Sequence, residues 1–379
     1  MLASLANWRI APFNRRAFHH VRELIPNADI SNDPHAISLL ERRSCDFKNL
    51  RIDPDSGEAL GLEAFIRETD TDGMAIVHRG RLVFERYANG MTEETPHILM
   101  SVSKSLLGVL IEILAEQRAL RLDGLVTDVL PELKETAYRG ATIRHLLDMR
   151  VGIAWDEDYS ATAGPIVEYR KATGWNPLAP GESPSDLHSF YQILTAGYGH
   201  GGPCHYVSPN SDLLGWVIER ATGRRYAELM SELVWKPLGA ERSAYITVDR
   251  LGAPRCAGGM CVTLRDLARV GQWLIEEKPA WLQQLETAGD GRAWTEGDLA
   301  KYFPRLPMRY RSQWYVLEGA APLVFGLGIH GQNLFIDRAN QIVIAKFSSQ
   351  AAPLDAPRIG LTMRGVSQLR KNVAGMRDY

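Results

Sequence analysis

A serine and a lysine three positions apart form the segment of this chain best suited to covalent chemistry, Ser101-Val102-Ser103-Lys104. On a helix, residues i and i+3 share one face, so the Lys104 amine can reach the Ser101 hydroxyl. A serine hydroxyl becomes a strong nucleophile only when a neighbouring base takes its proton. Lysine can act as that base if burial lowers its pKa, and the apolar residues on both sides of the motif favour burial. The pair predicts acyl transfer; the alternative is an ordinary helix start with a serine cap and a solvated lysine.

A polar segment before a second apolar helical pattern could supply the acid, Tyr206-Val207-Ser208-Pro209-Asn210-Ser211-Asp212. Tyr206 could lie over Ser101 and share a proton with Lys104, in which case the two groups titrate as a pair. The alternative is a capping loop, with Ser211 or Asp212 capping the helix and Tyr206 packing against it.

A glycine-rich segment, residues 325–333, begins a predicted strand near the other end of the chain. Glycines in strands often allow a ligand to approach the backbone closely. We expect the main-chain N–H of Ile329, together with that of Ser101 at a helix N-terminus, to form an oxyanion hole. His330 is a further candidate at the substrate site, although we expect it to be structural rather than a general base.

The elements that position these groups can be predicted from their apolar spacing. Residues 74–78 and 82–87 predict one β-hairpin, and residues 328–336 and 342–345 predict another. Between them the spacing is mostly helical, as at residues 106–114 and 213–218, and a helical pattern at residues 358–373 closes the chain. The predicted fold class is α+β, with one antiparallel sheet flanked by terminal helices and a helical region inserted.

Composition excludes several classes of protein. The chain has 379 residues, 45% hydrophobic and 23% charged, with a net charge of -2, so nothing favours nucleic acid or an anionic membrane as a partner. We find no signal peptide and no apolar run of roughly 18 residues. Four cysteines are too sparse for a disulfide framework or a zinc ribbon, and His200, Cys204 and His205 lack a recognised metal spacing. We therefore expect a cytoplasmic enzyme without cofactor or metal, acting on a small-molecule ester or amide. A homodimer is among the assemblies that the sequence leaves open.

Several strings together resemble the 6-aminohexanoate-dimer (nylon-oligomer) hydrolases and their carboxylesterase relatives, within the class C β-lactamase-like, penicillin-recognising serine hydrolases. The strings cover nearly the whole chain and include residues 14–18, 99–105, 206–212, 263–271 and 328–333. The resemblance implies an α/β region (residues 1–95, 195–275 and 295–379), a helical region (96–194 and 276–294) and an active-site cleft between them. It also implies Ser101 as acyl acceptor, Lys104 and Tyr206 as base and acid, the Ser101 and Ile329 N–H groups as oxyanion hole, and Tyr159 as a substrate contact.

The chain departs from that family at positions that bear on its substrate. Ser208 stands where a β-lactamase has asparagine, and Gly326-Leu327-Gly328 replaces a Lys-Thr-Gly motif, so recognition of a penicillin carboxylate is not expected. Arg170 stands where efficient nylon-oligomer hydrolases have an acidic residue facing the substrate's ammonium group, unless it merely pairs with Glu168 or Asp158. The preferred function is hydrolysis of esters or linear amides. The alternatives are a β-lactamase or D-alanyl peptidase-like enzyme, or an inactive binding protein on this fold. No serine lies in a G-x-S-x-G elbow, which excludes an α/β-hydrolase.

Overall fold

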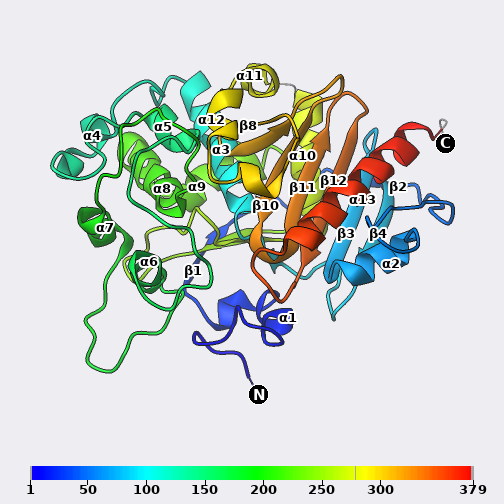
Figure 1. The fold of residues 1–379 in the computed structure, drawn as a ribbon, viewed down its shortest axis with the longest axis horizontal. Coiled ribbons are helices and arrows are strands. Elements are labelled where there is room, and N and C mark those ends of the chain that lie inside the picture. Colours follow the sequence, from blue (N-terminus) through cyan, green and yellow to red (C-terminus); the bar gives the residue numbers. More distant parts are fainter. Residues whose placement is uncertain (1, 278, 377–379) are drawn as a thin grey trace.

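Two β-sheets form the framework of the computed structural model, which describes residues 2–277 and 279–376 (Figure 1). The larger sheet has eight strands, antiparallel throughout except for the parallel pair β2 and β4. Its order is β2 (Glu41–Arg42), β4 (Arg81–Tyr87), β3 (Thr71–His78), β12 (Ile342–Ser348), β11 (Gln332–Asp337), β10 (Leu323–Gly328), β9 (Trp314–Leu317) and β8 (Met308–Arg311). The smaller, antiparallel sheet has the order β1 (Asn27–Ile30), β6 (Ala244–Thr247), β7 (Met260–Val262) and β5 (His97–Ile98).

The helices differ widely in length, and the four longest are α3, α8, α10 and α13. Their bounds are α1 (Asn14–Ala17), α2 (Leu62–Glu68), α3 (Val102–Glu116), α4 (Val126–Val129), α5 (Ile143–Leu147), α6 (Pro165–Ala172), α7 (Leu187–Phe190), α8 (Ser208–Thr222), α9 (Tyr226–Met230), α10 (Leu264–Glu277), α11 (Ala280–Thr287), α12 (Gly291–Thr295) and α13 (Ala356–Ala374). No helix in the described part of the chain is long and apolar enough to span a membrane.

Both faces of the large sheet are covered, which explains why strand β3 is buried along its whole length and apolar at residues 74–77. Side chains alternate between the faces of a strand. Met74 and Ile76 pack into one core with α2 and α13, whereas Ala75 and Val77 pack into another with α10. Figure 1 shows α13 lying across one face of the sheet. β3 is therefore buried on both faces of the sheet.

Helix α3 lies between the sheet and the remaining helices. It contacts β9, β10 and β11 on one side and α8 on the other, and almost all of its residues are buried. Helices α4 to α8 gather to one side of the large sheet (Figure 1). Helix α8, in the segment we assigned to the α/β region, packs against α3, α4 and α5 of the helical side. The proposed boundaries of the two regions stay a prediction.

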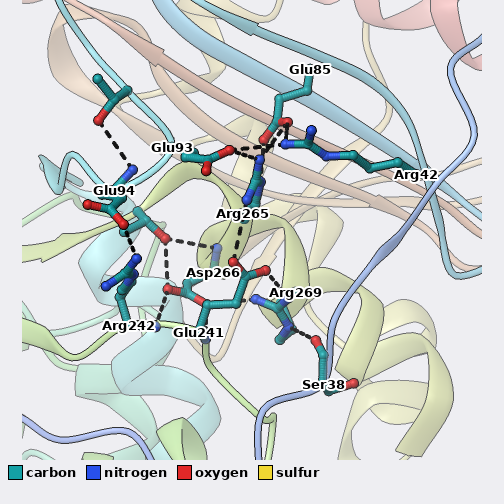
Figure 2. Close-up of polar contacts among 12 residues, drawn as sticks. Ser38, Arg42, Glu85, Glu93, Glu94, Glu241, Arg242, Arg265, Asp266 and Arg269 are labelled. Carbon is teal, nitrogen blue, oxygen red and sulfur yellow. Dashed lines mark hydrogen bonds and ion pairs between the residues drawn. The ribbon is translucent and has the colours of Figure 1, made fainter. Parts of the chain in front are cut away.

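A network of ion pairs connects α10 to the segments around it (Figure 2). Arg265 of α10 pairs with Glu85 of β4 at 2.6 Å, and Arg269 pairs with Glu241 at 2.6 Å. Arg265 also pairs with Glu93, in the segment that leads into β5 and then to Ser101. The network therefore connects the segment that leads to Ser101 to α10.

The predicted elements are found, with two corrections. The first hairpin is β3 and β4, and the closing helix is α13. The second hairpin is β11 and β12, but the predicted strand from residue 328 is interrupted by a 3₁₀ turn at Ile329–Gly331 that separates β10 from β11. The α+β fold class is confirmed. The sheet differs from the single antiparallel one that we expected: there are two sheets, and one strand pair is parallel, because strands too short to show an apolar pattern complete both of them.

Candidate active site

Ser101 and Lys104 meet at the first turn of α3. Ser101 is the residue that precedes the helix, and Lys104 is buried with its Nζ 2.9 Å from Ser101 Oγ. Burial lowers the pKa of Lys104 to about 7; Arg255 adds to the lowering, while Glu157 and Asp212 oppose it. A large fraction of the lysine is therefore uncharged at neutral pH, and an uncharged amine at this distance can accept the serine proton.

A buried carboxylate in α8 holds Lys104 in place through the backbone. Asp212 Oδ1 accepts a 2.6 Å hydrogen bond from the N–H of Ala257, whose carbonyl accepts a 2.7 Å bond from Lys104 Nζ. Asp212 Oδ2 accepts from Arg255 and from the Tyr169 hydroxyl, each at 2.5 Å. Asp212 thus stabilises the loop that orients the lysine, instead of capping α8.

Tyr206 lies beside the same pair. Its ring centre is 5.0 Å from Lys104 Nζ, and its side chain is buried. Burial raises the pKa of Tyr206 far above its ordinary value, and hydrogen bonding with Ser101 and Tyr315 opposes that rise only in part. The phenol therefore keeps its proton at neutral pH, so it has a proton to transfer to a strongly basic leaving group. Tyr315, on β9, was not foreseen because no short motif contains it.

The two predicted oxyanion donors lie next to residues with strained backbones. Met100, directly before Ser101, has φ 45°, and His330, directly after Ile329, has φ 61°. Left-handed conformations of non-glycine residues are uncommon and often mark functional sites. At Gly328 an added Cβ would lie 2.7 Å from the Leu99 carbonyl oxygen, so a glycine is needed where β10 approaches the strand that leads to Ser101. Ser101 and Ile329 line the same cavities.

Two cavities of unequal size open on Ser101. The first, a wide cleft of about 790 Å³, is lined by Tyr206, Tyr315 and apolar residues of β10 and α13. The second, a narrow pocket of about 30 Å³, is lined by Arg9, Arg170, Trp175 and Ser208. Ser101, Glu157, Tyr159 and Ile329 line both, whereas Tyr206 lines only the wide cleft.

Three of the remaining predicted site residues line the cavities. Tyr159 lies on both cavities, and Ser208 and Arg170 line the narrow pocket. Arg170 does not pair with Glu168 or with the Asp158 carboxylate; it donates to the Asp158 and Ala161 carbonyls, each at 3.2 Å. It therefore holds the loop that carries Tyr159.

His330 is placed differently from the other candidates. It lines neither cavity, is buried, and its Nδ1 bonds the Gln350 carbonyl at 2.7 Å. Burial lowers the pKa of His330 to about 4, so it stays neutral. The structure gives no support for a substrate contact by His330, because its ring nitrogen is bonded to the main chain.

Glu157 is a site residue that the sequence analysis missed. Its carboxylate accepts from the Ser208 hydroxyl at 2.5 Å, the Ser208 N–H at 2.9 Å and the Trp155 indole at 2.6 Å. The acidic residues directly before Tyr159 were a signal that could have found it. Glu157 brings a negative charge to both cavities.

Comparisons with known proteins show which family the chain belongs to. The model of the Beta-lactamase family matches residues 62–364. The chain is 34% identical over 359 residues to a 6-aminohexanoate-dimer hydrolase of Paenarthrobacter ureafaciens, covering 92% of this chain and 89% of the relative. A solved structure described as a proposed 6-aminohexanoate-dimer hydrolase from Bacillus anthracis superposes with a TM-score of 0.89 at 24% identity, covering 99% of this chain and 98% of that one.

A second solved structure shares the fold at a greater distance. EstCE1, a hydrolase with promiscuous acyltransferase activity, superposes with a TM-score of 0.63 at 19% identity, covering 83% of this chain and 96% of that one. The family match spans most of the chain, and the curated relative spans nearly all of it. The chain belongs to the beta-lactamase family and is a serine hydrolase.

Proposed function

We propose that this protein hydrolyses small carboxylic esters or linear amides through an acyl-enzyme on Ser101. The observation that carries the proposal is the buried Lys104 amine, 2.9 Å from Ser101 Oγ and with a pKa lowered to about 7. A base whose pKa lies near the working pH is the best compromise between availability and strength.

Lys104 and Tyr206 carry out the proton transfers of the proposed reaction. Uncharged Lys104 takes the Ser101 proton as Oγ attacks the carbonyl carbon, and the N–H groups of Ser101 and Ile329 stabilise the oxyanion. The Tyr206 hydroxyl protonates the leaving group, and the Lys104 ammonium returns a proton to Tyr206. A water molecule then hydrolyses the acyl-enzyme with the same groups, and Ser101 is released.

The two cavities assign the two halves of the substrate. Because Tyr206 protonates the leaving group and lines only the wide cleft, the leaving group lies there. The acyl group then faces the narrow pocket, whose roughly 30 Å³ admits only a short chain. We therefore propose short-chain acyl esters with bulky, partly apolar leaving groups as preferred substrates.

Positive charge in the narrow pocket further restricts which acyl groups the pocket can accept. Arg9, Arg170 and Arg255 line it, and the nearby Arg170 and Arg255 guanidinium groups add to burial in lowering the pKa of Arg9 to about 9. Asp212 neutralises Arg255, and Glu157 is the acidic residue on the pocket wall. The curated relative is named for a dimer of an amino acid; an ammonium-bearing acyl group would meet repulsion here, so we propose weak activity on it and tolerance of anionic acyl groups.

We also propose that the enzyme works in the cytoplasm, on free small molecules rather than on nucleic acids or membranes. The four cysteines are free thiols, and Cys204, Cys256 and Cys261 are buried, which suits a reducing compartment. A homodimer is a further proposal; size-exclusion chromatography with light scattering measures it.

Covalent labelling tests the assignment of Ser101. A fluorophosphonate or a slow acyl donor should add one label, seen by intact mass, and Ser101→Ala should abolish it. Ser103→Ala is the matched control, because Ser103 Oγ accepts a 3.1 Å bond from the Met260 N–H inside the core. A label on Ser103 or Ser105, or unchanged labelling of the Ser101 variant, would refute the proposal.

A further inference from the structure

Three buried side chains far apart in sequence converge where the two sheets and the N-terminal segment meet. Asp72 lies on β3 of the large sheet, His97 on β5 of the small sheet, and His19 on the segment after α1. One ligand atom from each lies within 4.8 Å of the others, and all three residues are buried. The mechanism proposed above uses none of them.

Hydrogen bonding fixes the tautomer of His97. Its Nδ1 lies 2.8 Å from the Ile98 carbonyl oxygen, which can only accept, so Nδ1 carries the proton. In the neutral ring Nε2 then presents a lone pair, and it faces Asp72 Oδ2 at 3.4 Å. A lone pair opposite a carboxylate oxygen is repulsive unless a cation lies between them. An Nδ1–H bonded to a backbone carbonyl is also how metal-binding histidines are commonly oriented.

The other two groups lack a partner of the right kind. His19 Nε2 lies 3.9 Å from Asp72 Oδ2 and has no hydrogen-bond partner among the described residues. Asp72 is buried and accepts a 3.0 Å bond from the Ser349 hydroxyl. Lys346, the buried amine of this part of the core, bonds Ser348 Oγ instead of Asp72. A buried carboxylate is costly without a close cation, which here would be a bound metal ion or a proton on one of the two imidazoles.

The spacing favours a metal ion over a shared proton. Charge-assisted N–H···O bonds are about 2.7–2.9 Å long, shorter than either contact to Asp72. Two ligands of one tetrahedral zinc, each about 2.0–2.1 Å from the metal, lie about 3.3 Å apart. His19 Nε2, which lies 3.9 Å from Asp72 Oδ2, would have to move closer to share that metal ion. Two imidazoles with one carboxylate suit a divalent transition metal.

We propose that His19, Asp72 and His97 bind a divalent transition-metal ion, with zinc as the probe. The site is structural. It links the N-terminal segment, whose Phe18 carbonyl accepts a 3.0 Å bond from the Ile98 N–H, to the strand that runs directly into Ser101. A metal there would clamp that segment against both sheets.

Metal content and thermal stability test the site in the full-length protein with any histidine tag removed. After chelation and reloading with zinc, elemental analysis for zinc, iron, manganese, nickel and copper should find about one metal ion per chain. Zinc should raise the Tm of the chelated protein by about 3 °C or more. His19→Gln should lose the bound metal and the shift, whereas His20→Gln, at its half-buried neighbour, should keep both.

Two results would overturn the proposal. Wild-type protein that holds no metal after reloading and shows no zinc-dependent shift would mean that a proton serves the cluster. Equal zinc binding by His19→Gln and wild type would place the metal elsewhere. If His19→Gln does not fold, the wild-type measurements and an X-ray absorption spectrum showing two imidazole ligands still decide the question.

Discussion

At the scale of single residues, the environment of the Lys104 amine sets the pH range of the enzyme. Only the uncharged amine accepts the Ser101 proton, and its pKa is lowered to about 7. We predict that kcat/KM for a neutral ester rises with pH through an apparent pKa near 7. Rates measured from pH 5 to 9 check this, and a profile that is flat across the range would remove Lys104 as the base.

A substitution of Glu157 tests the direction in which that pH profile should shift. Its negative charge raises the pKa of Lys104, so Glu157→Gln should move the rise in activity to lower pH. Asp156→Asn, at an exposed neighbouring carboxylate, should move it much less. Equal shifts in the two variants would mean that general surface charge is responsible.

A second prediction at this scale concerns the proton donor. Tyr206→Phe removes one hydroxyl from a buried ring, so the fold should persist while kcat falls by about 10²–10⁴, the usual contribution of general acid–base catalysis. Tyr310→Phe is the matched control, because Tyr310 packs edge-on against Tyr206 and lines neither substrate cavity. Circular dichroism and steady-state kinetics on both variants decide it; near-normal turnover of Tyr206→Phe would leave the mechanism without its acid.

At the scale of elements, the end of β10 must approach the strand before Ser101 closely enough for the Ile329 N–H to serve the reaction. Gly328→Ala would bring a Cβ to 2.7 Å from the Leu99 carbonyl oxygen, and backbone atoms cannot move aside cheaply. We predict a fall in kcat on the order of 100-fold, since displacements of about 1 Å have that effect. Gly61→Ala, where nothing lies within 4 Å, should leave kinetics unchanged. Unaltered kinetics of Gly328→Ala would show that the β10 end can shift without harm.

At the scale of the whole molecule, segments far apart in the sequence enclose two unequal cavities around Ser101. We predict that kcat/KM for p-nitrophenyl esters falls from acetate to octanoate by 10-fold or more, since a roughly 30 Å³ pocket cannot hold a long acyl chain. Varying the alcohol at constant acetyl group should have a smaller effect, because the wide cleft receives it. A preference for octanoate would reverse the assignment of the cavities.

A second prediction at this scale concerns the positive charge of the narrow pocket. Wild type should cleave the linear 6-aminohexanoate dimer poorly, and Arg170→Asp should raise that activity relative to acetate hydrolysis. Good activity of wild type on the dimer, unchanged by the substitution, would show that Arg170 acts only on the Tyr159 loop.

Local sequence determined much of this protein. The S-x-x-K motif predicted the contact between Ser101 and Lys104, because residues three apart on a helix are neighbours whatever surrounds them. Two strand-like runs on either side of a short turn predicted β3 and β4, and helical spacing predicted α13. Tyr206 was predicted from a polar segment before an apolar helix and Ile329 from a glycine-rich strand, in both cases in agreement with the family resemblance, and both residues line the wide cleft.

Only the tertiary structure decided the rest, because it depends on distances between residues remote in sequence. Asp212 looked like a helix cap, yet it is a buried ion-pair partner that holds the Ala257 loop. Glu157 and Tyr315 belong to no motif, and they reach the site through the packing of separate elements. The lowered pKa of Lys104 and the unequal cavities arise from burial by many segments together, which no local pattern encodes.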